Sequence, residues 1–460
     1  MASKEYPLTP QQVAPVHTAN RRITTAIPVP ESVPLLKRMR ADEPRSMRGQ
    51  APVLWAEGEG VHIRDPYGNQ WLDFSSGVLV TASGHGHPKV RRALAEMVER
   101  GVYHAYGFPT DIRARLSAKL VELAPEPLNK TFLLTTGAEA VECCLKLART
   151  YGLQHGGATK RVMVSFDNAF HGRTMGAQLA GGSAALKGWI GEGDYGFVQV
   201  PFPDGFRQKD ESFAVFEAAL EQQGVAGTEV CGVISETYQG CNAKLMPAEY
   251  AQALRRWCDD HGALLIFDEV QAGFGRTGRW FGFEHYSVVP DLVPCGKGIS
   301  GGMPLSAVLG RAEVMDLYGP GEMTSTHSAN PLCAAAALAN LEAIEEEDMV
   351  ANAARLEPVL REGAMRAQAA SRGRIGRVDC TGLVAALQFT RASDGGAVVS
   401  DPETAFEVYK RVVEAGVMLF SPVGVGGCCI KLNPPLMIDE AALREGLDVV
   451  VAAVEAVVGE

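Results

Sequence analysis

The sequence LVPCGKGISGGMP, residues 292–304, places one lysine, Lys297, between two glycines, with no other charged side chain in the stretch. Glycine lets a ligand approach the backbone closely and adopts conformations that other residues avoid. A lysine in apolar surroundings has a lowered pKa because desolvation disfavours its charged form, and a Schiff-base nucleophile needs a neutral amine. The stretch therefore indicates either a nucleophilic lysine or a tight turn with a solvated lysine.

The string GKGISG, residues 296–301, also fits the dinucleotide-binding pattern G-x-G-x-x-G. That pattern needs a strand before the glycines and a helix that opens on them. Pro304 follows the string closely and no long helical pattern begins there, so the match is discarded.

The composition predicts a globular protein whose partners are small molecules. A chain of 460 residues suggests two or three domains, and its hydrophobic content of 46% and charged content of 21% are ordinary. The formal net charge of −11 argues against nucleic acid or an anionic membrane as the main partner.

Several features favour the cytoplasm. No apolar run approaches the roughly 20 residues that span a bilayer, and the N-terminus has no hydrophobic region of a secretory signal. The ten cysteines include no C-x-x-C pair, and buried free thiols in a reducing compartment are their simplest explanation.

The first part of the chain reads as an arm followed by a hairpin. Residues 1–50 are polar and proline-rich, which indicates an arm lying on a surface, its own or a partner's. Residues 61–63 and 70–74 flank the turn residues 65–69 and predict a β-hairpin. His85 and His87 follow in a glycine-rich loop, where hydrogen-bonded histidines are favoured over metal ligands. A helix is expected from Pro88, with Val90, Leu94, Met97 and Val98 on its apolar face.

Short apolar strands alternate with helices from about residue 115 to 345, and this pattern predicts a largely parallel sheet covered on both faces. Ligands are then expected at the carboxyl ends of the strands. From about residue 346 the pattern changes to a smaller α+β domain that begins with a long helix, 350–371. The expected strands of the sheet are 131–136, 162–166, 198–202, 230–235, 263–268, 292–295 and 305–310.

Three features accompany Lys297 at this expected edge. Gly137 stands at a strand-to-helix turn, which either frees N–H groups for a phosphate or serves packing. Asp268 ends the buried run ALLIFD and needs a cationic partner, such as a helix arginine or a ligand. Phe170 follows another strand and either stacks on a planar ligand or plugs the core. Together with Lys297 they describe a pyridoxal phosphate pocket, in which the acid keeps the pyridine nitrogen protonated.

The chain resembles the class III pyridoxal-phosphate-dependent aminotransferases, the family of 4-aminobutyrate, ornithine and acetylornithine aminotransferases. The resemblance runs from about Gly58 to Leu436 and implies fold type I, with a mostly parallel seven-stranded sheet in a large domain and a small α+β domain built from both chain ends. On this chain it implies an arm at 1–50, a small domain at 51–85 and 346–460, and a large domain at 86–345. The motifs that carry the resemblance include GHGHPKV, TTGAEAVECCLKLAR, FHGRT, ISETYQG, LLIFDEVQAGFGRTG, PDLVPCGKGISGGMPLSAV, THSANP and KLNPPL.

The resemblance also implies roles for individual residues around pyridoxal 5′-phosphate. Lys297 is then the lysine of the Schiff base and the base of the proton shift, and Asp268 pairs with the pyridinium nitrogen. Thr326 completes the phosphate site from a neighbouring subunit, which implies a homodimer with shared sites and leaves a tetramer open. The remaining expected cofactor contacts are Gly137 and Ala138 to the phosphate, Phe170 and Val270 on the ring faces, Gln271 at the ring hydroxyl, and His171 and Glu236 nearby.

Four residues are implied for the substrate: Arg173, Glu236, Lys431 and Val78. Arg173 matches an arginine that binds the distal carboxylate in 4-aminobutyrate aminotransferases. Glu236 matches a glutamate that pairs with an arginine in many relatives, but lysine stands at that position here, as Lys431. Lysine offers a point charge where arginine offers a bidentate fork. We therefore expect an ion pair between Glu236 and Lys431, and a donor whose amine is remote from, or lacks, an α-carboxylate.

The expected activity is transfer of an amino group, typically from an ω-amine, to a small 2-oxo acid such as pyruvate or 2-oxoglutarate. The alternative is a racemase, decarboxylase or lyase of the same family, because geometry in such a pocket decides which bond breaks. A non-catalytic protein would have lost Lys297 or Asp268, and neither is lost.

Overall fold

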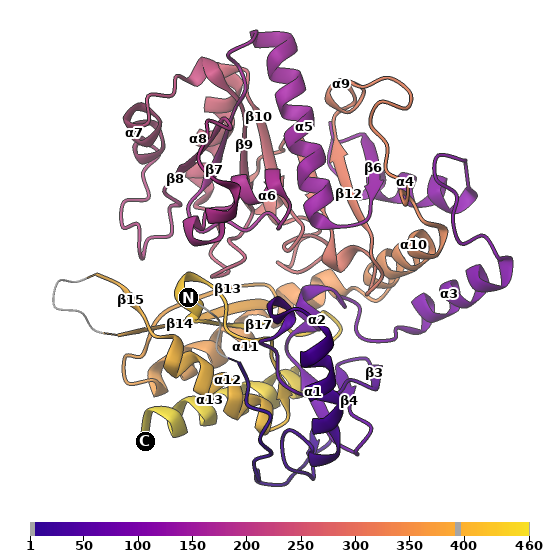
Figure 1. Cartoon of the computed structure of the whole chain (residues 1–460), viewed down its shortest axis with the longest axis vertical. Coiled ribbons are helices and arrows are strands. Elements are labelled where there is room, and N and C mark those ends of the chain that lie inside the picture. Colours follow the sequence, from indigo (N-terminus) through magenta and orange to yellow (C-terminus); the bar gives the residue numbers. More distant parts are fainter. Residues whose placement is uncertain (1–4, 392–396, 460) are drawn as a thin grey trace. The chain divides into compact units, whose positions relative to one another are not determined.

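The computed structural model describes residues 5–391 and 397–459 and divides the chain into two compact units (Figure 1). The central unit is continuous and comprises Pro88–Ala351. The terminal unit combines Met1–His87 with Asn352–Glu460. The domain boundaries placed at residues 50, 85 and 345 from the sequence remain predictions.

A seven-stranded sheet forms the core of the central unit. Neighbouring strands are parallel except around β12, which is antiparallel to both β6 and β11. The prediction of a largely parallel sheet is therefore confirmed, and so is each of its strands. In order across the sheet they are β6 (Lys130–Leu134), β12 (Ser306–Gly310), β11 (Leu292–Cys295), β10 (Leu264–Asp268), β9 (Val230–Glu236), β7 (Val162–Phe166) and β8 (Phe197–Val200).

Helices cover this sheet and bury its strands. All residues of β9, β10 and β11 are buried, as near-continuous apolar runs predict for strands enclosed on both faces. The helices of the central unit are α3 (Pro88–Arg100), α4 (Asp111–Leu123), α5 (Gly137–Gly156), α6 (Met175–Ala180), α7 (Ala214–Gln222), α8 (Ala248–His261), α9 (Ala312–Met315) and α10 (Pro331–Glu346).

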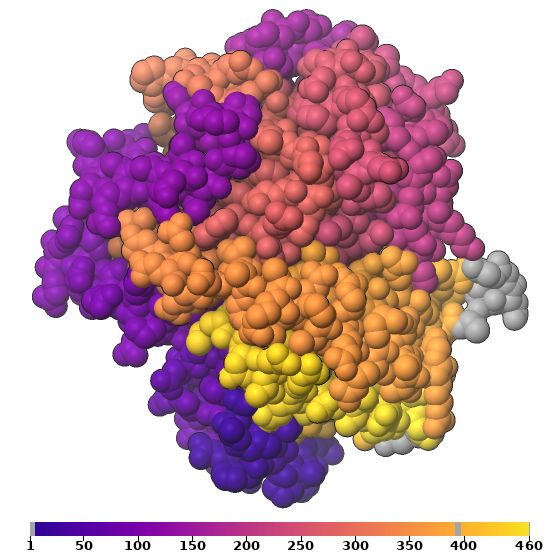
Figure 2. All heavy atoms as spheres, turned by 180° about the vertical axis from the view of Figure 1, so that it is seen from behind, coloured from indigo at the N-terminus to yellow at the C-terminus, as the bar shows by residue number. Residues whose placement is uncertain are grey.

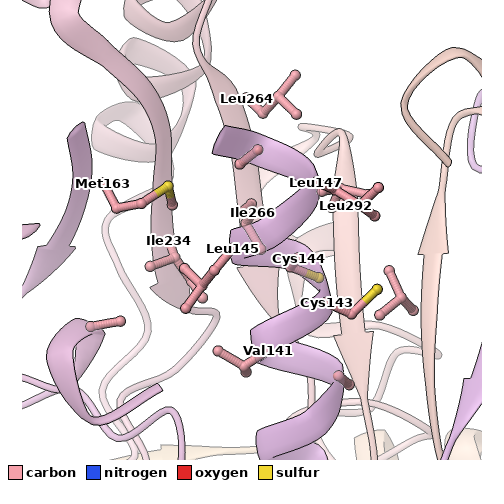
Figure 3. Close-up of a cluster of buried hydrophobic side chains, with 14 of the residues drawn as sticks. Val141, Cys143, Cys144, Leu145, Leu147, Met163, Ile234, Leu264, Ile266 and Leu292 are labelled. Carbon is pink, nitrogen blue, oxygen red and sulfur yellow. The ribbon is translucent and has the colours of Figure 1, made fainter. Parts of the chain in front are cut away.

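Helix α5 lies against five strands of the sheet, β7, β9, β10, β11 and β12. Its residues Val141, Cys144 and Leu145 project toward the strands in Figure 3, where they meet Ile234 and Ile266. Because α5 is held along most of its length, its first turn has a fixed position above the end of β6.

The carboxyl ends of the parallel strands meet at one edge of the sheet. The register pairs Asp268 at the end of β10 with Glu236 at the end of β9. β11 ends at Cys295, directly before Gly296 and Lys297. Asp268, Glu236 and Lys297 therefore lie at the same carboxyl edge of the sheet, where ligands bind in open α/β sheets.

The expected helix from Pro88 is also present, but its apolar face is only partly covered. Val90 and Met97 of α3 are buried, whereas Val98 is 50% exposed. The predicted helix is therefore confirmed, but Val98, at the end of its apolar face, is left uncovered.

The terminal unit contains two sheets. The predicted hairpin is confirmed, and its second strand also pairs with a strand of the N-terminal arm and one of the C-terminal part. A strand at Ile375–Thr381 was not predicted, because Gly376 and Arg377 interrupt its apolar pattern. The strands are β1 (Val16–His17), β2 (Arg22–Ile23), β3 (Glu57–Glu59), β4 (His62–Arg64), β5 (Gln70–Asp73) and β16 (Val417–Met418) in one sheet, and β13 (Ile375–Thr381), β14 (Val384–Arg391), β15 (Val399–Ser400) and β17 (Cys429–Leu432) in the other.

Both ends of the chain contribute to this unit, and Figure 2 shows them together on its surface in indigo and yellow. An ion pair of 2.6 Å between Arg21 and Glu445 joins the arm to the last helix. His85 forms the hydrogen bond expected of a loop histidine, with its Nε2 2.6 Å from Asp73 Oδ2. The longer helices are α1 (Val33–Asp42), α11 (Met349–Ala370), α12 (Pro402–Glu414) and α13 (Glu440–Gly459). Among the described residues, no helix combines the length and apolarity needed to cross a bilayer.

A short left-handed turn, α2 (Ser76–Leu79), interrupts the chain after β5. Its φ angles are 48° at Ser76, 56° at Gly77, 66° at Val78 and 63° at Leu79. Asn433 holds the start of the turn, because its Nδ2 donates to the Ser75 carbonyl (2.6 Å) and its own carbonyl accepts from Ser76 Oγ (2.6 Å). Left-handed backbone is unfavourable for a β-branched residue, and Val78 is 43% exposed, so its own packing gives little compensation.

Val78→Gly is therefore expected to raise the melting temperature of the protein, because glycine adopts this conformation without the roughly 1–2 kcal/mol penalty of other residues. Val80→Gly is the control, since Val80 has an ordinary φ of −95° and its substitution should lower the melting temperature. Thermal unfolding of the two variants measures both effects. A lower melting temperature for Val78→Gly would contradict the assignment of strain.

Candidate active site

A cavity of about 270 Å³ opens at the carboxyl edge of the central sheet. It brings together every candidate site residue of the central unit except Thr326. Its lining residues are Gly137, Ala138, Phe170, His171, Gly172, Arg173, Glu236, Asp268, Val270, Gln271 and Lys297.

Asp268 lies at the base of the cavity and is 4% exposed. Its Oδ2 accepts a hydrogen bond from His171 Nδ1 (2.7 Å), and its Oδ1 accepts one from the backbone N–H of Val270 (2.9 Å). The partner of the buried acid is thus a histidine and not the helix arginine that the sequence left open.

Lys297 follows β11 in a constrained backbone conformation with a φ of 42°. Burial lowers the pKa of its amine, while the nearby Asp268 and Glu236 carboxylates act in the opposite direction. Because burial dominates, the amine loses its proton more easily than a surface lysine, as a nucleophile requires. The structure therefore favours the nucleophilic lysine over a solvated turn.

Glu236 connects two loops beneath the cavity. Its Oε2 accepts from the backbone N–H of Phe170 (3.0 Å), and its Oε1 accepts from the backbone N–H of Gly240 (2.8 Å). Burial raises its pKa to about 7, opposed by His171 and assisted by the negative charge of Asp268. A side chain at position 240 would come within 2.6 Å of Glu236 Oε1 and 2.7 Å of Gln271 Nε2, so glycine is required there.

Phe170 and Arg173 occupy the outer part of the cavity wall. Phe170 is 42% exposed, so it is not a core plug, and its ring is free to contact a planar ligand. The Arg173 guanidinium lies 5.3 Å from the centre of this ring. Within residues 5–391 and 397–459, no carboxylate pairs with Arg173, which leaves a cation available at the wall.

The first turn of α5 forms another wall. Thr136 caps the helix by accepting from the N–H of Glu139, and the N–H groups of Gly137 and Ala138 have no acceptor within the helix. A Cβ atom on Gly137 would lie 2.7 Å from Val270 Cγ1, so glycine lets the helix start approach Val270. This wall suits an anion, because the helix dipole and free N–H groups both favour negative charge.

Three candidate residues lie outside the cavity. Thr326 is exposed in the loop before α10, next to Ser325, whose Oγ donates to Glu139 Oε1 (2.7 Å). Lys431 is buried in β17, and Val78 is exposed in α2, both in the terminal unit.

Two acids that support the site had no role assigned from the sequence. Glu142 of α5 accepts from the backbone N–H groups of Gly176 (2.8 Å) and Ala177 (3.1 Å), and so holds the segment after Arg173. Glu269 is fully buried and accepts from Thr237 Oγ1 and from the N–H groups of Gly282 and Phe283, both at 2.9 Å. A second acid directly after Asp268 was the available signal for Glu269, since a second buried charge also needs partners.

Comparison with known proteins identifies the family. The model of the family described as Aminotransferase class-III matches residues 45–454. The chain belongs to the class III aminotransferases. It is 34% identical to a 4-aminobutyrate aminotransferase of Mycobacterium leprae, over 94% of this chain and 97% of that protein. It is 31% identical to an alanine/serine racemase of Pyrococcus horikoshii, over 88% and 86% of the two chains.

Solved structures of transaminases have the same fold as this chain. An (S)-enantioselective omega-transaminase from Thermomicrobium roseum superposes with a TM-score of 0.82 at 28% identity, covering 93% of this chain and 98% of the other. The chain is therefore an aminotransferase, and like its family it depends on pyridoxal phosphate.

The residues that line the cavity fit this cofactor in their chemistry. They offer free N–H groups at a helix start for a phosphate, a buried carboxylate for a pyridinium nitrogen, an exposed aromatic ring for a planar face, and a lysine amine.

The burial of Glu269 predicts how the stability of the protein depends on pH. Burial raises its pKa to about 7 from an ordinary 4.5, so the folded state holds the proton more tightly than the unfolded chain. Its contribution to stability is full below pH 4.5 and is lost as the pH rises through about 7. Glutamine does not titrate, so the stability of the parent relative to Glu269→Gln should fall across this interval, by up to about 3 kcal/mol.

Melting temperatures of the parent and of Glu269→Gln between pH 5 and pH 8 test this prediction. Glu284→Gln is the matched control, because Glu284 is only half-buried and belongs to the short helix η6 (Gly282–Tyr286), whose first two N–H groups donate to Glu269. A difference between parent and Glu269→Gln that stays constant with pH would contradict the raised pKa.

Proposed function

We propose that this aminotransferase takes its amino group from an ω-amine, of the type of 4-aminobutyrate or another amine donor, and transfers it to a small 2-oxo acid such as pyruvate or 2-oxoglutarate. The observation that carries the proposal is Arg173 at the cavity wall, which has no carboxylate partner in the described part of the chain, together with Lys297 in the same cavity. A cation there suits a carboxylate that lies away from the reacting amine. The 4-aminobutyrate aminotransferase relative supports the same donor class.

Each cavity residue then has a role toward the cofactor. We assign the phosphate to the N–H groups of Gly137 and Ala138, the ring faces to Phe170 and Val270, and the ring hydroxyl to Gln271. Asp268 would pair with the pyridinium nitrogen, with His171 and Glu236 next to it. The bound cofactor supplies an electron sink for the carbon that loses its proton. Lys297 Nζ, with its lowered pKa, is the group that removes and returns this proton.

The substrate set includes two residues of the terminal unit. We propose that Lys431 pairs with Glu236 and that Val78 contacts the donor. Both oxygens of Glu236 already accept backbone N–H groups, and a lysine adds only a point charge. Bidentate capture of an α-carboxylate is therefore disfavoured, which again points to donors without one near the amine.

A spectroscopic experiment tests the donor class. The holoenzyme is mixed with single amines, namely 4-aminobutyrate, β-alanine, ornithine, taurine and a simple diamine, with no keto acid present. We expect the yellow absorption of the bound cofactor to bleach lastingly with an ω-amine, because the amino group stays on the cofactor until an acceptor arrives. Lys297→Ala should abolish this bleaching. Lys431→Ala should change the constants for donor or acceptor, and unchanged constants would remove the role of Lys431.

The alternative is a racemase, decarboxylase or lyase of the same family. The similarity to an alanine/serine racemase supports this alternative. Such an enzyme would consume an amine or amino acid while its absorption returns to the starting state. Lasting bleaching by α-amino acids only would contradict the ω-amine proposal while leaving transamination intact.

We also propose a homodimer with shared sites. Thr326 lies outside the cavity of its own chain, and an exposed apolar surface adjoins its loop. Tyr106 Oη donates to Thr324 Oγ1 (3.1 Å), and Asn330 Nδ2 donates to the Tyr103 carbonyl (2.7 Å), which connects the two segments. The exposed fractions in this surface are Val98 50%, Val102 45%, Tyr103 51%, Tyr106 41% and Phe108 73%. Exposed apolar side chains gathered within one short segment, residues 98–108, suit a protein interface.

Subunit mixing tests whether Thr326 acts on the partner's site. Lys297→Ala and Thr326→Glu should each be inactive at limiting cofactor, the second because its carboxylate repels the phosphate. Co-expression of the two should restore about one quarter of the sites, since half of randomly paired dimers then contain one intact site. Thr324→Glu is the control for an added charge. If a verified mixed dimer recovers no activity, Thr326 acts in the site of its own chain. The molecular mass of the assembly in solution shows separately whether dimers pair into tetramers.

We infer a cytoplasmic location. All ten cysteines are free thiols, and nine of them are buried, which supports a reducing compartment.

A further inference from the structure

His171 makes one polar side-chain contact in the described part of the chain, and that contact is with Asp268. Nδ1 of the ring lies 2.7 Å from Oδ2 of the carboxylate, and the two residues are 3% and 4% exposed. An ionised carboxylate only accepts hydrogen bonds, so Nδ1 carries the proton and donates it in either charge state of the ring.

The other ring nitrogen distinguishes this histidine from a packed core residue. Nε2 is buried and has no hydrogen-bond partner among the described residues. A buried polar atom without a partner is unfavourable, so an apolar ring would serve a purely structural role better. The contact with Asp268 is what a histidine provides here and a phenylalanine or leucine does not.

The contact also completes the surroundings of Asp268. Oδ1 is held by the N–H of Val270 at 2.9 Å and Oδ2 by His171, so each oxygen has one donor and the carboxylate plane is fixed. The neighbouring Glu236 is an acid whose pKa Asp268 raises, which shows that the two negative charges repel. A donor on Asp268 therefore favours its ionised form against this repulsion.

We propose that His171 is a positioning residue that keeps Asp268 ionised and oriented for the pyridinium nitrogen of the cofactor, and so sets the affinity for pyridoxal phosphate. The proposal rests on the role assigned to Asp268 under the proposed function. It concerns this chain's own carboxylate, and it assigns His171 no contact with the substrate.

Two amide variants separate the donor from the bulk of the ring. His171→Asn places an amide N–H near the position of Nδ1, whereas His171→Gln places it near the position of Nε2. We expect His171→Asn to retain cofactor affinity within a few-fold, and His171→Gln and His171→Leu to weaken it by about 10- to 100-fold, as for a lost hydrogen bond to a charged group. Titration of the apoprotein with pyridoxal phosphate, followed by tryptophan fluorescence, measures the Kd without any turnover.

A double-mutant cycle tests whether His171 acts through Asp268. In an Asp268→Asn background the loss caused by His171→Leu should shrink to about two-fold, because the carboxylate that it served is gone. Equal losses in both backgrounds would overturn the proposal and leave His171 as packing. If Asp268→Asn itself leaves the Kd unchanged, the role of Asp268 under the proposed function fails instead.

The pH dependence of the bound cofactor's absorption gives an independent readout. The titratable and charged side chains that line the cavity are His171, Arg173, Glu236, Asp268 and Lys297, and the buried Glu269, Cys144 and Cys295 also lie close enough to Asp268 to feel its charge. His171→Gln should shift the pH at which the spectrum changes, and His171→Asn should leave it near the parent value. Melting temperatures of the apoproteins show which variants fold. Identical spectra and Kd values for the folded Asn and Gln variants would overturn the proposal.

Discussion

Two buried carboxylates side by side are the constraint around which the site is built. The parallel register places Asp268 next to Glu236, and burial makes each charge unfavourable unless donors reach it. The donors come from neighbouring loops: the N–H groups of Phe170 and Gly240 for Glu236, and His171 with the N–H of Val270 for Asp268. Satisfying the acids therefore also fixes the loops that carry the wall of the cavity. The same electrostatics act on Lys297, whose half-buried side chain lies near both acids.

Close backbone approach is the second requirement, because an open cavity at a packed sheet edge depends on missing side chains. A Cβ atom on Gly137 would meet Val270, and one on Gly240 would meet Glu236 and Gln271. Lys297 itself has a φ of 42°, which other structure must hold in place. The hydrogen bond from the Glu269 N–H to the Pro294 carbonyl (3.0 Å) joins the ends of β10 and β11 and contributes to this. The paired ends of β10 and β11 thus hold Lys297 in its unfavourable backbone conformation beside the cavity.

Much of this was predictable from local patterns, and the rest depended on distant contacts. Continuous apolar runs identified the seven strands, and a carboxylate after such a run identified Asp268, since a buried strand end leaves few alternatives. The roles of Glu269 and Glu142 were not predictable because their partners lie on other loops. β13 was missed because Gly376 and Arg377 break its pattern. Val98 followed the helical period but is exposed, because periodicity identifies an apolar face and not what covers it.

The difference between Glu236 and Arg173 bears on the choice of donor. Both oxygens of Glu236 accept backbone N–H groups, so a movement of its carboxylate would break two hydrogen bonds, of which the one from Gly240 is buried. Arg173 has no such commitment, and its guanidinium rests over an aromatic ring that does not compete for its hydrogen bonds. A carboxylate entering the cavity therefore meets an available cation in Arg173, whereas Glu236 is itself an acid that already accepts backbone N–H groups. A guanidinium binds carboxylates bidentately, and this is the physical basis for proposing donors that carry a carboxylate at the far end from the reacting amine.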